Sequence, residues 1–203
     1  MARRQDNIII HTFDAVLREN GFSRRNKSWF LARPETILVL DLDKSSWGDN
    51  YFLSFGVLVR QLSSVLMPKL IDCHVFQRIE MLLRERDVAR QAIDSVSDPH
   101  AERELSTTPA ADIIRRKDTP VSFNSNELDA SQIYKALNLE DKSLSEPERE
   151  AVIKYAIMSC GLPFLFELDS LEKIAKTLRV KDLSRMFVHQ SLREILGLSL
   201  GHA

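Results

Sequence analysis

The sequence has few of the residues that most often define a catalytic or cofactor motif. Its 203 residues include only 6 glycines and 2 cysteines, and it contains no G-x-x-x-x-G-K-[ST], G-x-G-x-x-G or G-x-S-x-G segment. Cys73 and Cys160 lie far apart in apolar surroundings, which predicts buried free thiols rather than a disulfide framework. No histidine has metal-ligand spacing with Cys73, so we expect neither a metal nor a cofactor.

Long apolar runs and a strong charge of either sign are also missing. The longest apolar runs are only a few residues, so we expect no membrane span and no membrane partner. A net charge of −1 predicts no general affinity for polyanions. Polar and charged residues interrupt the segment after the basic start, and we therefore expect a cytoplasmic protein. With 44% hydrophobic residues, the chain can form a sizeable core.

A dense group of strand signals lies between Gly21 and Val59. Strands are predicted at 29–32, 37–42 and 51–59, because each range is rich in β-branched, aromatic and aliphatic residues and is bounded by Pro, Gly or polar residues. The short connections between them favour antiparallel pairing. Alternation along the middle strand puts three leucines on one face, and the other face becomes acidic towards its end (Leu38, Leu40, Leu42; Asp41, Asp43).

Helical signals lie at both ends of the chain. The range from Asp6 to Asn20 carries apolar residues at helical spacing, with Asp6 as the expected cap and Gly21 after the last turn. Nearer the C-terminus, Ser145 and Glu148 form a capping-box pattern. The predicted C-terminal helices cover 128–137, 145–161, a stretch beginning at 169 or 170, and 182–196, with a turn at 162–164 and a stop at Gly197.

These elements indicate an α+β protein. An antiparallel sheet, made of the N-terminal meander and a fourth strand at 71–79, is packed by the N-terminal helix and by the C-terminal helical region. The apolar run 71–79 fits the start of a helix as well as a strand. By composition the chain divides into a sheet region (1–94), a long loop or poorly ordered excursion with a helical piece near 111–116 (95–126), and a helical region packed on the same core (127–203), in one domain overall.

Several short motifs together resemble a known family. They are G-F-x-R-R from Gly21, W-F from Trp29, K-S-x-W-G from Lys44, Y-F-x-x-x-G from Tyr51 and D-C-H-V-x-x-R-I from Asp72. In this order they resemble an uncharacterised bacterial family of unknown function (DUF4304-like), and 161–172 resembles its C-terminal turn into a helix. The resemblance implies an α+β fold with an antiparallel sheet and carries no established activity. Such small families lie beside toxin or defence genes in some bacteria, which is an association and not a mechanism.

Two groups of residues are candidates for catalysis. Asp41, Asp43 and Lys44 form D-x-D-K at a strand end, as in metal-dependent nucleases, but adjacent strand residues point to opposite faces and favour solvent-facing charges. Cys73 with His74 suggests a thiol nucleophile or metal ligands; a buried thiol beside a hydrogen-bonded histidine explains the pair better. Arg78 would share a strand face with His74.

Binding candidates lie on the meander. A cationic, aromatic surface for single-stranded nucleic acid is one interpretation, and an edge strand protected by charge is the other (Arg24, Arg25, Lys27, Arg33; Phe22, Trp29, Phe30). Trp47 before Gly48 either closes the core as a lid, which we favour, or projects as an anchor for a partner.

The sequence therefore favours a non-catalytic, cytoplasmic protein that binds a protein partner, as an immunity or defence-associated component. Its expected contact residues are Arg24, Arg25, Trp47 and Tyr51. The alternative is a metal-dependent nuclease-like domain, or another domain acting on nucleic acid, which would use Asp41, Asp43, Lys44, His74 and Arg78.

Overall fold

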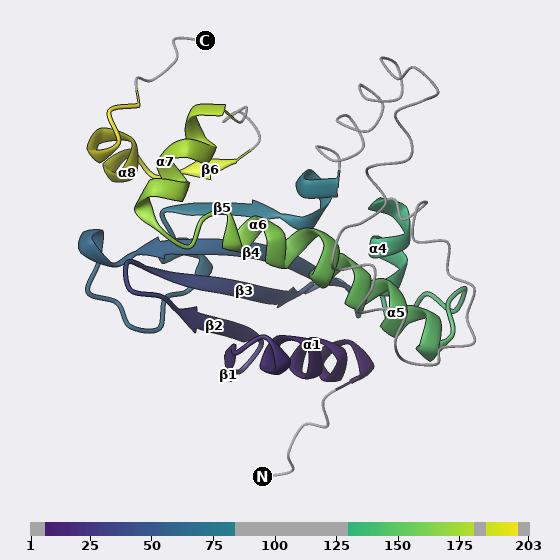
Figure 1. Ribbon diagram of the computed structural model, residues 1–203. Helices are drawn as coiled ribbons and strands as arrows, with labels where there is room; N and C mark the ends of the chain where they lie inside the picture. Colours follow the sequence, from purple (N-terminus) through teal and green to yellow (C-terminus); the bar gives the residue numbers. More distant parts are fainter. Residues whose placement is uncertain (1–6, 84–129, 181–185, 199–203) are drawn as a thin grey trace, which may run out of the picture.

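The protein contains one six-stranded antiparallel sheet whose strands lie side by side in chain order (Figure 1). The computed structural model describes residues 7–83, 130–180 and 186–198. The strands are β1 (Ser23–Arg25), β2 (Ser28–Ala32), β3 (Thr36–Lys44), β4 (Tyr51–Val59), β5 (Val75–Arg78) and β6 (Phe187–Val188). The predicted α+β class and meander are confirmed. The expected loop at 95–126 and its helical piece lie outside the described residues.

Helices flank this sheet, and they come from both ends of the sequence. They are α1 (Ile8–Glu19), α4 (Ala130–Ala136), α5 (Glu146–Ala156), α6 (Leu162–Phe166), α7 (Leu171–Val180) and α8 (Gln190–Ile195), with short 3-10 turns η1 (Arg60–Leu62) and η2 (Leu70–Asp72). The predicted capping box of Ser145 and Glu148 begins α5. The expected cap of the first helix was wrong by one residue, because the Asn7 side chain accepts the Ile10 N–H at 3.2 Å.

The turn predicted at 162–164 is absent, and the chain stays helical from α5 to α6. A π-helical segment, η5 (Ile157–Gly161), joins the two helices. Beyond Pro163 the helix continues, since Glu167 N–H donates to Pro163 O at 3.0 Å. A wider π turn adds a residue locally, and it lets the helix pass a proline that has no N–H to donate. The proline was therefore a poor guide to where the helix ends.

Two other segments differ from the sequence prediction. The range 71–79 combines both alternatives, because β5 follows η2 and residues 79–83 are helical. The single helix expected at 182–196 is wrong: among the described residues of this range, from 186 on, Phe187 and Val188 form β6, which pairs with β5, and the helix that follows is the shorter α8. The predicted stop at Gly197 is confirmed by its φ of 63°. The sequence could not indicate β6, because its two residues are too few to show the alternating pattern of a strand.

One face of the sheet carries the main core. On this face α1 packs through Phe13, whose ring stacks on Trp29 with centroids 5.5 Å apart. The α5–α6 helix crosses the same side of the sheet (Figure 1), and Phe55 meets Phe164 edge-on at 6.3 Å. A single buried cluster includes residues of α1, the sheet and the C-terminal helices. The helices at both ends of the chain thus bury the same sheet face.

The opposite face is covered in part by the chain between β4 and β5. Cys73 joins a small buried cluster with Phe30, Ile37, Val39 and Leu58. This segment lies so close to the sheet that a Cβ on Gly56 would come 2.6 Å from Cys73 Sγ. Glycine is needed at that position because the backbone of β4 and the thiol approach each other directly.

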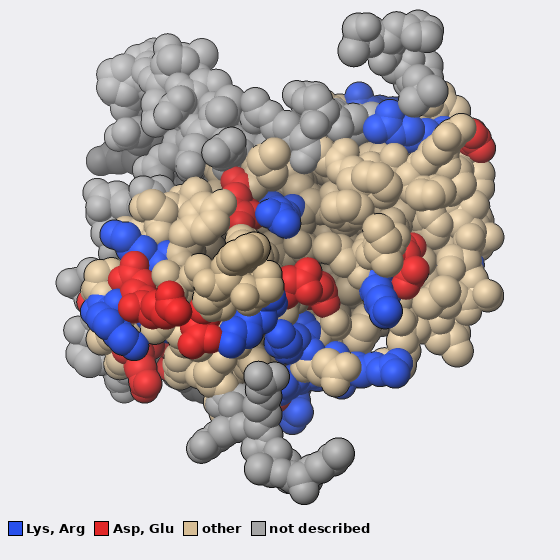
Figure 2. Space-filling view, turned by 180° about the vertical axis from the view of Figure 1, so that it is seen from behind, with Lys and Arg blue, Asp and Glu red and all other residues tan. Residues whose placement is uncertain are grey.

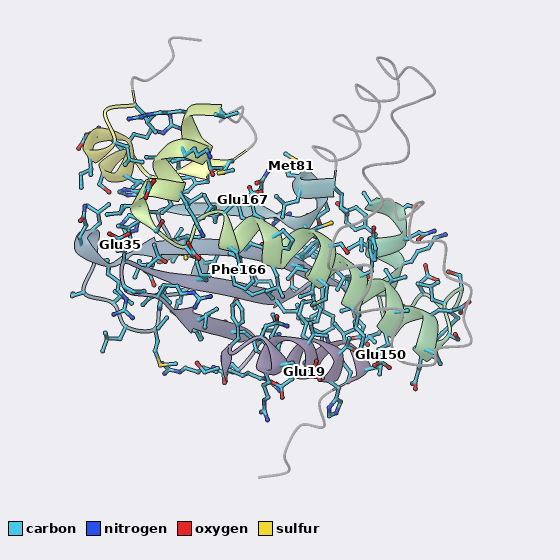
Figure 3. The ribbon with its side chains drawn as sticks, viewed as in Figure 1. Glu19, Glu35, Met81, Glu150, Phe166 and Glu167 are labelled. Carbon is cyan, nitrogen blue, oxygen red and sulfur yellow. The ribbon has the colours of Figure 1, made fainter. Side chains whose placement is uncertain are left out.

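The helical region is also fixed to the sheet at the turn between β2 and β3. Thr36 Oγ1 donates to Asp169 O at 2.8 Å, and Leu171 N–H donates to Glu35 Oε2 at 2.9 Å. Figure 3 labels Glu35 in this turn and Phe166 at the end of α6, where the Arg33 guanidinium lies 5.6 Å from the Phe166 ring centroid. These contacts orient α6 and α7 relative to the strands.

Within residues 7–83, 130–180 and 186–198, no single helix is long and apolar enough to cross a bilayer. The pair Glu146–Phe166 and Leu171–Val180 reaches that length only when both parts, bent by 106°, are combined.

Candidate functional site

A polar row crosses the sheet on the face opposite α1. Ser28, Asp41, Ser54 and Arg78 are register partners on β2, β3, β4 and β5. The Ser28 hydroxyl donates a hydrogen bond to the Asp41 carboxylate. Partial burial raises the pKa of Asp41, the Ser28 hydrogen bond opposes this shift, and nearby Asp43 adds to it. Sequence reasoning had singled out Asp41 and Arg78 separately, and the structure places them in one row.

The other predicted catalytic residues do not join this row. Lys44 is the register partner of Tyr51 at the end of β3, and its ammonium forms an ion pair with Asp49 across the hairpin. Asp43 lies on the same face as Asp41, two residues further along the strand, and is exposed. Arg78, which does belong to the row, places its guanidinium 5.2 Å from the Phe52 ring centroid. A carboxylate pair with a converging lysine is therefore not formed.

Cys73 and His74 have structural surroundings, as the sequence suggested. Burial raises the pKa of the Cys73 thiol to about 12, and the neighbouring Asp72 adds to the shift, so the reactive thiolate is strongly disfavoured. His74 is buried, and its Nδ1 accepts the Val59 N–H at 3.0 Å. Burial lowers the pKa of His74, with His189 as the second cause. Both cysteines are free and buried, as predicted.

No metal centre is assembled in the parts of the chain that the structure describes. Those residues contain no group of three or more His, Cys, Asp or Glu side chains placed to hold an ion. The carboxylates of Asp41 and Asp43 thus have no third such ligand beside them within the described ranges.

The predicted binding residues divide into buried and exposed groups. Tyr51 is buried, and its hydroxyl accepts a hydrogen bond from Asn7 Nδ2 at 2.8 Å, so it is not the exposed anchor we expected. Arg24 is half-buried: its guanidinium lies 5.6 Å from the Trp29 ring centroid, and its Nε donates to Asn26 O. Only Arg25 and Trp47 of the four expected contact residues are exposed.

Trp47 does not close the core, and the favoured lid interpretation was wrong. Its side chain is 96% exposed at the tip of the β3–β4 hairpin. The hairpin itself is firmly held, since Ser45 N–H donates to Asn50 O at 2.8 Å and Leu139 N–H donates to Asp49 O at 3.0 Å. Trp47 points outwards because Tyr51 and Leu53, further along β4, already fill the end of the core.

A shallow pocket of about 250 Å³ lies beside this hairpin. It is formed where the start of β4 meets α4 and the turn after it, and its lining mixes aromatic, amide and charged side chains (Asn50, Tyr51, Phe52, Tyr134, Lys135, Asn138, Asp141). Small-molecule sites usually enclose roughly 300–1,000 Å³. This pocket is smaller and open, and it suits one side chain of a partner better than a substrate. Sequence reasoning missed it, because the residues that line it lie on segments far apart in the chain.

Comparison with known proteins identifies the N-terminal region. Residues 13–109 match the family model for a domain of unknown function, DUF4304, which supports the resemblance that the sequence motifs indicated. The comparisons with curated proteins and with solved structures gave no match. The matched range ends before residue 161, and the resemblance of 161–172 stays a prediction.

Proposed function

We propose that this protein acts by binding a protein partner, and that its contact surface is the end of the sheet formed by the β3–β4 hairpin and the neighbouring pocket. The observation that carries the proposal is the 96% exposure of Trp47 on an anchored hairpin. A tryptophan side chain has only two rotatable bonds, so on an anchored backbone it loses little conformational freedom on binding, and tryptophan is among the residues that contribute most at interfaces.

The pocket supports the same surface. It adjoins the hairpin through Asn50, and it contains the half-exposed ring of Tyr134 together with Lys135 and Asp141. An aromatic anchor next to a small recess with both signs of charge is typical of a protein interface core and its polar rim. Hydrogen bonds join the hairpin to the turn after α4, and they hold Trp47 and the pocket in a fixed position relative to each other.

The alternative function, metal-assisted chemistry on nucleic acid, has less support. Lys44 is paired with Asp49, His74 is buried, and Asp41 and Asp43 point away from the hairpin lysine. Asp43 is nevertheless the residue on which that alternative depends, because it is an exposed carboxylate next to the polar row. For the cellular setting we propose an immunity or defence-associated role, which rests on the family resemblance alone, in the cytoplasm, which the polar and charged residues after the basic start favour.

The test compares three variants of the tagged full chain in its native cells. Trp47→Ala should release the co-purifying partner, with affinity for the isolated partner reduced by roughly 30-fold, the effect of losing about 2 kcal/mol at an interface hot spot. Val180→Ala removes an exposed apolar side chain from α7, far from the hairpin in sequence, and should leave binding unchanged. Loss of function in Asp43→Asn alone, with metal-dependent turnover of nucleic acid by the wild type, would show that the protein is an enzyme.

A further inference from the structure

The chain between β4 and β5 carries a second group of exposed apolar residues, which the proposed function does not use. Leu66 is 78% exposed and Ile71 is 79% exposed, and Val65 and Met67 beside them are also exposed. We call residues 60–74 the β4–β5 loop. Apolar side chains grouped on one surface loop mark a binding site more often than those scattered singly over a surface.

This loop has a defined backbone, so its apolar side chains are held outwards. Pro68 is buried, and a Cβ on Gly56 would lie 3.0 Å from Leu70 Cδ1 and 3.1 Å from Cys73 Cβ, which shows how closely the loop rests on the sheet. The Asp72 carboxylate accepts the Lys69 N–H at 2.8 Å. Pro68 and Cys73 thus face the protein, while Leu66 and Ile71 face outwards.

The surroundings of the loop are cationic. Arg25 on β1 reaches Met67, with its guanidinium 3.6 Å from the sulfur, and Arg60 and Lys69 are exposed within the loop. Together with Arg25, the β4–β5 loop holds three Lys or Arg and one Asp, a net charge of +2 in a chain whose total is −1. The one acid among them, Asp72, is exposed and accepts the Lys69 N–H, so the basic side chains outnumber the acidic ones on this surface.

We infer that the β4–β5 loop docks on the surface of a bilayer that contains anionic lipids. Leu66 and Ile71 would enter the headgroup boundary while Arg25, Arg60 and Lys69 contact lipid phosphates, the arrangement of apolar and basic residues that binds such interfaces. Figure 2 views the molecule from behind and shows a broad, mostly uncharged area that contains a few acidic and basic groups, with Lys and Arg gathered along its lower edge. The expectation of no membrane partner came from the lack of a spanning segment, and a docking loop needs none.

A protein partner is less suited to this surface. The described part of the loop contains no aromatic residue, whereas interface cores are enriched in Tyr, Trp and Phe. Aliphatic side chains can enter the apolar region below the lipid headgroups, and neighbouring Lys and Arg are attracted by the negative surface potential of anionic lipids. The inference is independent of Trp47, which lies on the β3–β4 hairpin.

The test is co-sedimentation of the full chain with vesicles of phosphatidylcholine alone and of phosphatidylcholine mixed with phosphatidylglycerol. We expect binding to the mixed vesicles, weakening as salt is added. The double variant Leu66→Ser/Ile71→Ser should bind at least tenfold more weakly. Charge reversal in Arg25→Glu/Lys69→Glu should reduce binding by more than the about fivefold expected for removing a single basic residue.

Val180→Ser is the matched control, since it removes an exposed apolar side chain from α7 and should bind vesicles like the wild type. Circular dichroism melting shows that each variant is folded. Three results would overturn the inference: no sedimentation with mixed vesicles at low salt, equal binding to both vesicle types, or an equal loss in Val180→Ser. None of them would affect the protein-partner proposal, whose readout is the loss of a co-purifying protein in Trp47→Ala.

Discussion

Arg149 closes the end of one helix from a position on another. Its guanidinium donates to the carbonyl oxygens of Lys135, Ala136 and Asn138, and to that of Asp141, at 2.7–2.8 Å. The last carbonyls of a helix have no partner within the helix, so this buried side chain takes the place of a C-terminal cap for α4. An arginine in the first turns of α5 would be expected to face solvent, and no sequence pattern predicts its burial.

Replacing this side chain should be costly. In Arg149→Met the four carbonyls lose their donor in a buried setting, and we expect the free energy of unfolding to fall by at least about 3 kcal/mol in a denaturant titration. Lys154→Met on the same helix removes only an exposed ion pair with Glu150 and should change stability by less than about 1 kcal/mol. Similar losses in the two variants would contradict the capping interpretation.

The π-helical segment between α5 and α6 is the element that sets how closely the helices approach the sheet. A Cβ on Gly161 would lie 2.4 Å from Phe55 Cε1, a distance that forces the helix or the ring to move. We expect Gly161→Ala to destabilise the protein by about 1–3 kcal/mol, measured by thermal or denaturant unfolding. Gly48→Ala is the control, because its nearest contact would be an ordinary 3.5 Å from Glu140 and it should cause no such loss.

The junction of β5, β6 and α8 should make stability depend on pH. Burial and His189 lower the pKa of His74 below its usual 6.5, so the unfolded chain binds a proton more readily than the folded one. The stability from this group is complete above pH 6.5 and decreases as the pH falls below that value. Protonation of Nδ1 would also remove the acceptor for the Val59 N–H.

The variant His74→Asn tests this. Asparagine can still accept the Val59 N–H through its carbonyl oxygen but does not titrate. Plots of melting temperature against pH should therefore converge or cross for wild type and variant as the pH falls from 7.5 to 5. Curves that stay parallel would show that His74 makes no pH-dependent contribution.

At the scale of the whole molecule, the sequence predicted what depends on local pattern. Alternation and turn residues defined β2, β3 and β4 nearly to the residue, and the capping box located the start of α5. The parts it missed depend on contacts between distant segments: the helix that passes Pro163, the two-residue β6, and the burial of Tyr51. The same holds for the candidate binding surface. The sequence identified Trp47 as a candidate, but its exposure and the pocket beside it became visible only in the folded structure.

Folding of the whole chain should require neither a metal nor a disulfide. Cys73 and Cys160 are buried free thiols, and the residues that the structure describes hold no cluster of metal ligands. Addition of chelator, or of reductant, should leave the thermal transition where it was, as followed by calorimetry. A large drop in transition temperature with chelator would mean that an ion stabilises the native state.

The pairing of β6 with β5 has a consequence for how the chain reaches its native state. Each of β1 to β4 pairs with its neighbour through a short connection, whereas Val75 and Val188 are brought together across more than half of the sequence. Closing so large a loop costs conformational entropy, and the two register pairs of β5 and β6 offset little of it. We therefore expect the hairpins to form early and this edge to be added late. The same edge, with α8 attached to it, should be the first part of the sheet to exchange its amide protons with solvent.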